Sequence, residues 1–142
     1  MTNIGGRQRS LLQILLLALF TTGPAVAQDA RTRQRDPGWV APVKNASTTN
    51  PLANRPAAAA GGRKLFLQRC STCHGDQGQG TAKAPDLVTA DVQAQSDGAL
   101  FWKISGGNAH TGMPAFSFLP EPQRWQLVLH IRALGTGATP SR

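Results

Sequence analysis

The feature that most restricts how this chain can fold is the short run Cys70-Ser71-Thr72-Cys73-His74. Its two cysteines are the only ones among 142 residues, so they cannot belong to a disulfide-rich scaffold. Gly62, Phe66 and Arg69 precede them at steps of three and four residues, a spacing typical of one side of a helix. We therefore expect the two thiols to lie one turn apart, at the C-terminal end of that helix.

Two thiols at this spacing can each add to a vinyl group of haem, and the imidazole of His74 can then bind the iron. A redox-active dithiol would need a thioredoxin-like βαβ context, and the sequence has no strand-like alternation of useful length. A zinc site would need a second group of ligands, whereas His110 and His130 stand alone. The motif therefore predicts one haem c, attached covalently through Cys70 and Cys73.

The first 27 residues have the features of a secretory signal peptide. Two arginines precede an apolar run from Leu11 to Phe20, and Ala25-Val26-Ala27 forms a small-residue cleavage site. The run is about half of the roughly 20 residues that a membrane-spanning helix needs. We expect cleavage after Ala27, export to the periplasm, and no membrane span in the mature chain.

Residues 28–56 are expected to form a flexible basic arm or linker. They are rich in Pro, Asn, Thr and Ala, and they cannot bury enough apolar surface to order themselves. Arg31, Arg33 and Arg35 could contact the phosphates of a nucleic acid, but an exported chain rarely meets one. We therefore predict a solvated spacer and no nucleic-acid partner, although the whole chain carries a net charge of +8.

Residues 57–135 are expected to form one domain, and residues 136–142 a disordered tail. A domain this short rarely has enough apolar core to fold by itself, and it usually needs a metal, a cofactor or disulfides. The expected covalent haem would supply that support.

Three helices are expected in this domain, which predicts an all-α fold with long loops. One precedes the cysteines, and a second is capped by Ser96 and ends at Gly106-Gly107. The third opens at Pro120, presents a broad apolar face and ends at Gly135.

The iron bound by His74 has a second axial position, and Met113 is the only methionine left once the signal peptide is removed. A lone methionine is more often core filler than a ligand. Gly112 and Pro114 flank this one in a loop, where its thioether can be held at a fixed reach, so we predict that Met113 is the ligand. His110 is the alternative, and it would give a bis-histidine haem of lower potential.

Over residues 57–135 the sequence resembles the small class I c-type cytochromes. The motifs that carry the resemblance are Gly62-Arg63-Lys64-Leu65-Phe66, Cys70-Ser71-Thr72-Cys73-His74-Gly75, Pro85-Asp86-Leu87, Gly112-Met113-Pro114-Ala115-Phe116 and the helix from Trp125 to Leu134. The C-x-x-C-H is the only one that is highly specific by itself, and the order and spacing of the others add support. The resemblance implies a cytochrome c fold around one covalently attached haem, with the first and last helices crossing at Gly62 and Phe66.

The resemblance also implies roles for individual residues. The backbone carbonyl of Pro85 would accept the hydrogen of His74 Nδ1 and so fix the ring. Four apolar residues would line the haem pocket: Leu87, Leu100, Phe101 and Trp102. His130 stands where family members usually have an aromatic residue, so we expect a packing or surface histidine at the helix crossing.

The sequence therefore predicts a periplasmic mono-haem c-type cytochrome that carries one electron at a time, or an electron-accepting subunit of a periplasmic dehydrogenase. A haem peroxidase or gas sensor with a labile Met113 is the alternative, but no distal acid–base pair is evident for peroxide cleavage. The expected partners are redox proteins, namely a dehydrogenase donor and a terminal oxidase or other acceptor, met through weak, charge-steered contacts. We expect a monomer that is an electron-transfer protein rather than an enzyme.

Overall fold

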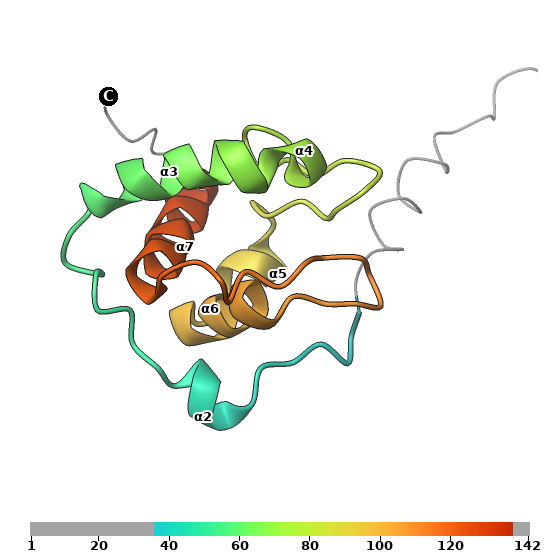
Figure 1. Cartoon of the computed structure of the whole chain (residues 1–142), viewed down its shortest axis with the longest axis horizontal. Coiled ribbons are helices and arrows are strands. Elements are labelled where there is room, and N and C mark those ends of the chain that lie inside the picture. Colours follow the sequence, from blue (N-terminus) through green and yellow to red (C-terminus); the bar gives the residue numbers. More distant parts are fainter. Residues whose placement is uncertain (1–35, 138–142) are drawn as a thin grey trace, which may run out of the picture.

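The computed structural model describes residues 36–137 (Figure 1). Its helices are α2 (Val43–Ala46), α3 (Ala58–Arg69), α4 (Ser71–His74), α5 (Ala90–Gln93), α6 (Asp97–Gly106) and α7 (Glu121–Thr136). Three of these are long and three are single turns, and the described part of the chain has no strand, so the all-α prediction is confirmed. The predictions for residues 1–27 and 138–142 lie outside the described residues. No helix within 36–137 is long and apolar enough to cross a membrane.

The first and last long helices, α3 and α7, cross in close contact at Gly62 (Figure 1). A Cβ atom on Gly62 would lie 1.9 Å from the backbone oxygen of Gln126, so only glycine permits this approach. One turn later, the buried ring of Phe66 meets His130 edge-on, with ring centroids 5.0 Å apart. The crossing implied by the resemblance is thus present, and His130 is a packing histidine within it.

The burial of His130 makes folding stability depend on pH. Neither ring nitrogen has a hydrogen-bond partner, and burial, with the positive charge of Arg63, lowers the pKa of His130 from 6.5 to about 4. Between these values the unfolded chain binds a proton that the folded chain does not. This contribution to stability is therefore complete above about pH 6.5 and is lost as the pH falls toward 4.

Replacing this histidine by phenylalanine is expected to remove that pH dependence. In urea titrations of the haem-loaded chain, the wild type should lose about 2–3 kcal/mol more than His130→Phe between pH 7 and pH 4. His110→Phe is the control, because His110 is exposed, and it should keep the wild-type slope. Parallel curves for the wild type and His130→Phe would contradict the assignment.

The helix ends follow the sequence signals, with one correction. Ser96 Oγ accepts a hydrogen bond from the backbone N–H of Ala99 and caps α6, as predicted. The prediction that the last helix ends at Gly135 is wrong, because α7 continues to Thr136. Gly137 ends it in the left-handed conformation, with φ 66°, which glycine adopts without strain. A core of aromatic and aliphatic side chains lies between α3, α6 and α7: Phe66, Leu100, Ile104, Phe116, Leu119, Trp125, Leu127, Val128 and Ile131.

The N-terminal part of the described chain, residues 36–56, packs against the helices, and this corrects the prediction of a flexible arm over 28–56. Ser96 Oγ donates a 2.6 Å hydrogen bond to the carbonyl of Ala46, which joins α2 to the start of α6. The buried side chain of Asn50 donates to the carbonyl of Trp125 in α7. Hydrogen bonds to backbone carbonyls thus hold the segment, and it also buries Ala41 and packs Leu52 against the core. Residues 28–35 lie outside the described residues.

Candidate functional site

A cavity of about 400 Å³ opens inside the helical core. Aliphatic and aromatic side chains from the three long helices, from α5 and from two loops line it: Phe66, Leu87, Val92, Leu100, Ile104, Phe116, Leu127 and Ile131. Protein interiors contain few voids larger than a water molecule, whereas ligand pockets measure about 300–1,000 Å³. The apolar walls and the volume therefore fit a large, flat, apolar group such as haem.

The C-x-x-C-H motif forms one wall of this cavity. α3 ends at Arg69 and α4 follows at once, so Cys70, Cys73 and His74 all reach the cavity from the same turn. Burial, with the neighbouring Cys73 thiol, raises the pKa of the Cys70 thiol to about 11. A redox-active dithiol needs a thiol pKa shifted in the opposite direction, so the burial of Cys70 does not favour disulfide exchange.

His74 is buried, and a hydrogen bond from its Nδ1 fixes the orientation of its ring. Its Nδ1 lies 2.9 Å from the backbone oxygen of Pro85, the hydrogen bond that the resemblance implies. With the Nδ1 hydrogen donated there, Nε2 keeps its lone pair for a metal. Burial also lowers the pKa of His74, which favours the neutral ring that a metal ligand requires.

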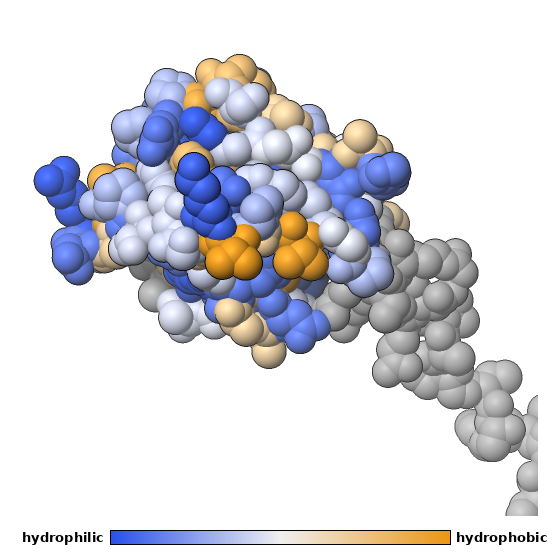
Figure 2. Space-filling view, turned by 90° about the horizontal axis from the view of Figure 1, so that it is seen from below, coloured by the Kyte–Doolittle hydropathy of each residue, from blue (hydrophilic) through white to orange (hydrophobic). Residues whose placement is uncertain are grey.

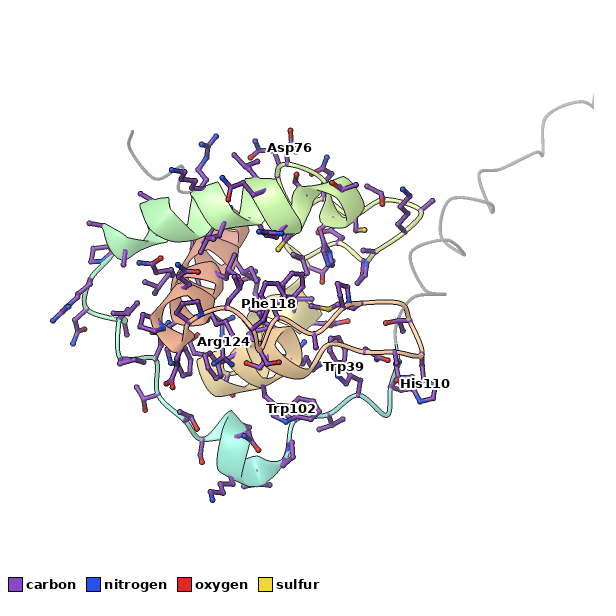
Figure 3. All side chains as sticks on the ribbon, in the orientation of Figure 1. Trp39, Asp76, Trp102, His110, Phe118 and Arg124 are labelled. Carbon is purple, nitrogen blue, oxygen red and sulfur yellow. The ribbon has the colours of Figure 1, made fainter. Side chains whose placement is uncertain are left out.

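Met113 reaches the same cavity from the loop between α6 and α7. The loop is closed by two backbone hydrogen bonds between Asn108 and Met113, of 2.9 and 3.0 Å. His110 lies at the outer end of this loop, exposed, and it is not among the residues that line the cavity (Figure 3). The structure thus brings Met113, and not His110, together with the cysteines and His74.

Two of the four residues expected to line the pocket need correction. Leu87 and Leu100 line the cavity, but Phe101 and Trp102 do not. Leu100, Lys103 and Ile104 share the inner face of α6, and the intervening positions turn away from it. Phe101 stacks on the Trp125 ring, with centroids 3.9 Å apart. Trp102 lines an outer depression together with Trp39 and His110 (Figure 3).

The sequence analysis missed three residues at this site: Asp36, Trp39 and Asn108. Asp36 and Trp39 line both the cavity and the outer depression. Asn108 is buried, and its side-chain oxygen accepts the backbone N–H groups of His110 and Thr111. An asparagine after two glycines is a turn signal that could have identified Asn108. Asp36-Pro37-Gly38 is also a turn signal, and the Gly38 N–H donates to Asp36 Oδ1, but nothing in the sequence places that turn at the cavity.

Comparison with known proteins places residues 57–131 in a protein family. They match the family described as cytochrome C oxidase, cbb3-type, subunit III. Among curated proteins, the cbb3-type cytochrome c oxidase subunit FixPc of Rhizobium leguminosarum bv. viciae is 31% identical over 86 residues, which cover 58% of this chain and 30% of that protein. Subunit FixP of Bradyrhizobium diazoefficiens is 34% identical over 83 residues, covering 56% and 28%. The chain thus matches less than a third of the length of these relatives, and no solved structure matches it.

Proposed function

Because the chain belongs to the family of cbb3-type cytochrome c oxidase subunit III, and is a small c-type cytochrome with haem c as its cofactor, we propose that it is a periplasmic one-electron carrier whose iron is bound by His74 and Met113. When bound, the haem supplies reversible one-electron exchange between ferric and ferrous iron. The protein would act as an electron-transfer component rather than as an enzyme.

The observation that carries this proposal is the meeting of four side chains at one apolar cavity. Cys70 and Cys73 attach the cofactor, and His74, oriented by the Pro85 carbonyl, offers Nε2 to the metal. Met113 approaches the cavity from a different loop, closed by its hydrogen bonds to Asn108. If His74 and Met113 both held the iron, no substrate would need to bind it, and these side chains would rearrange little when an electron moves.

Met113 is expected to raise the reduction potential, because a neutral, soft thioether favours ferrous iron. Met113→Ala and Met113→His should each lower the potential by on the order of 100 mV or more, equivalent to about 2.3 kcal/mol for one electron. Redox titration followed by the absorption spectrum measures this change. His110→Ala, on the same loop but outside the cavity, should leave the potential unchanged. A potential that stayed at the wild-type value in Met113→Ala would contradict the ligand assignment, and a fall in His110→Ala would point to His110 instead.

The proposed partners are redox proteins that meet the mouth of the cavity. Arg69, Lys83 and Lys103 line the cavity together with Asp36, Asp86 and Asp91, so its lining is balanced in charge. The excess of basic charge lies beside it on α3, where Arg63 and Lys64 are exposed. Basic charge at the site of contact would steer an acidic redox protein toward it. Because the relatives are named subunits of a cbb3-type oxidase, a terminal oxidase is the proposed electron acceptor. A dehydrogenase is the proposed donor.

The proposed location rests on residues 1–27, which have the composition of a signal peptide. Cleavage after Ala27 would release the mature chain into the periplasm as a monomer. In this proposal, haem c is attached to the two cysteines after the chain has been exported.

A further inference from the structure

An N-terminal strap, residues 36–50, crosses the outside of the cytochrome domain and ends beside the loop that carries Met113 (Figure 1). It precedes the stretch that matches the family, residues 57–131. The middle of the strap packs closely against α6. A Cβ atom on Gly98 of α6 would lie 2.1 Å from the carbonyl oxygen of Asn45, and its three nearest contacts are all strap carbonyl oxygens. The strap therefore has one defined position on α6.

The N-terminal end of the strap makes a hydrogen bond to the residue that closes the methionine loop. Asp36 Oδ2 accepts a 3.0 Å hydrogen bond from Asn108 Nδ2, while Asp36 Oδ1 accepts the backbone N–H of Gly38. Asn108 in turn exchanges two backbone hydrogen bonds with Met113. A continuous chain of contacts thus runs from Asp36 through Asn108 to Met113.

Trp39 adds a second contact between the strap and the cavity. Its side chain lines the cavity from the strap, and Lys103 Nζ of α6 lies 4.8 Å from its ring centroid. Burial lowers the pKa of Lys103, and the nearby carboxylate of Asp36 opposes that shift. The outer surface of the strap carries two exposed apolar side chains, because Val40 and Val43 are 71% and 86% exposed there. Figure 2, viewed from the side of α2, shows apolar residues among a mainly polar surface.

From these contacts we infer that the strap is a clamp, in which Asp36 is a positioning residue that holds Met113 at the iron through Asn108. The clamp rests on the proposed ligation by Met113. Three strap residues, Asp36, Pro37 and Trp39, line the same cavity as Met113, and they lie outside the matched stretch 57–131. Opening the clamp frees the loop from 108 to 113, and an external ligand can then take the place of the thioether.

Asp36→Asn tests the clamp with the smallest change of shape. The carboxylate accepts from Gly38 through Oδ1 and from Asn108 through Oδ2, whereas asparagine replaces one of these oxygens by an NH2 group that only donates, so one of the two hydrogen bonds is lost. In the full, haem-loaded chain, the rate at which imidazole displaces the sixth ligand of ferric iron should rise about tenfold, as the loss of one charge-assisted hydrogen bond implies. Hydrogen exchange at the Met113 amide should accelerate as well. Asp76→Asn, an exposed carboxylate that does not line the cavity, is the control for the charge change and should match the wild type (Figure 3).

A second variant tests the same clamp at the contact between the strap and α6. Gly98→Ala places a methyl group against the strap backbone, and it should accelerate imidazole displacement as Asp36→Asn does. Wild-type displacement rates in a folded Asp36→Asn chain would overturn the clamp; should that chain fail to fold, a wild-type rate in Gly98→Ala would do the same. The failure of ligation itself is distinguished by the Met113→Ala potential. If that potential equals the wild-type value, Met113 is not the ligand, whatever the exchange at its amide shows.

Discussion

Replacement of both Cys70 and Cys73 by serine is expected to abolish covalent haem binding and, with it, the stable fold. The cavity of about 400 Å³ lies within the core, so a chain without the attached group loses the contacts of every side chain that lines it. The helices alone form a domain too small to rely on its remaining apolar contacts. The variant should be colourless after acid extraction and should lack a cooperative unfolding transition.

The mass and optical spectrum of the purified chain measure this outcome together. The wild type should carry one haem on a chain that begins after Ala27. Thr72→Ala is the matched control, because Thr72 lies between the two cysteines, is exposed and does not line the cavity. It should keep the haem and the wild-type unfolding transition. A double serine variant that retained covalent pigment would contradict the assignment of the attachment site.

Gly62→Ala is expected to lower the stability of the haem-loaded chain by about 3 kcal/mol. The new methyl group would lie 1.9 Å from the backbone oxygen of Gln126, and backbone cannot rotate away as a side chain can. The α3–α7 crossing must therefore widen, which separates Phe66 from His130 as well. The thermal midpoint should fall by roughly 10–20 °C, measured by the loss of helical circular dichroism.

Gly61→Ala is the matched control, one residue away on the same helix. Its methyl group would meet the end of the Gln126 side chain, 2.7 Å from Oε1, and that flexible amide can move. Alanine also favours a helix over glycine by up to about 1 kcal/mol, so Gly61→Ala should be neutral or slightly stabilising. Equal losses of stability at the two positions would show that the cause is general to α3 rather than the close approach at Gly62.

The parts of this fold that could be predicted from the sequence are those that local spacing encodes. The C-x-x-C-H motif fixes its own geometry within one helical turn, and Ser96 marks the start of α6 through a contact only three residues away. The crossing at Gly62 could be predicted because the family resemblance supplied a long-range contact that periodicity cannot supply.

The predictions failed where the sequence is compatible with more than one local structure. Residues 99–102 are four consecutive apolar positions, so the pattern could not say that Leu100 faces the cavity and Trp102 does not. The strap belongs to the stretch 28–56, whose richness in Pro, Asn, Thr and Ala predicts a linker. It is held by single hydrogen bonds, such as that from Asn50 to the Trp125 carbonyl, and such contacts leave no periodic signal. Likewise, either Gly135 or Gly137 could have ended α7, and only Gly137 has the left-handed backbone.

The α3–α7 crossing also determines the order in which the protein can mature. The two helices that close the core stand at opposite ends of the domain, so a chain made from its N-terminus cannot complete the crossing until its last helix has followed. Until then the sulfur of Cys70, which is half-buried in the finished protein, stays open to the cofactor. Late closure therefore gives the cofactor time to be joined before the fold would shut it out.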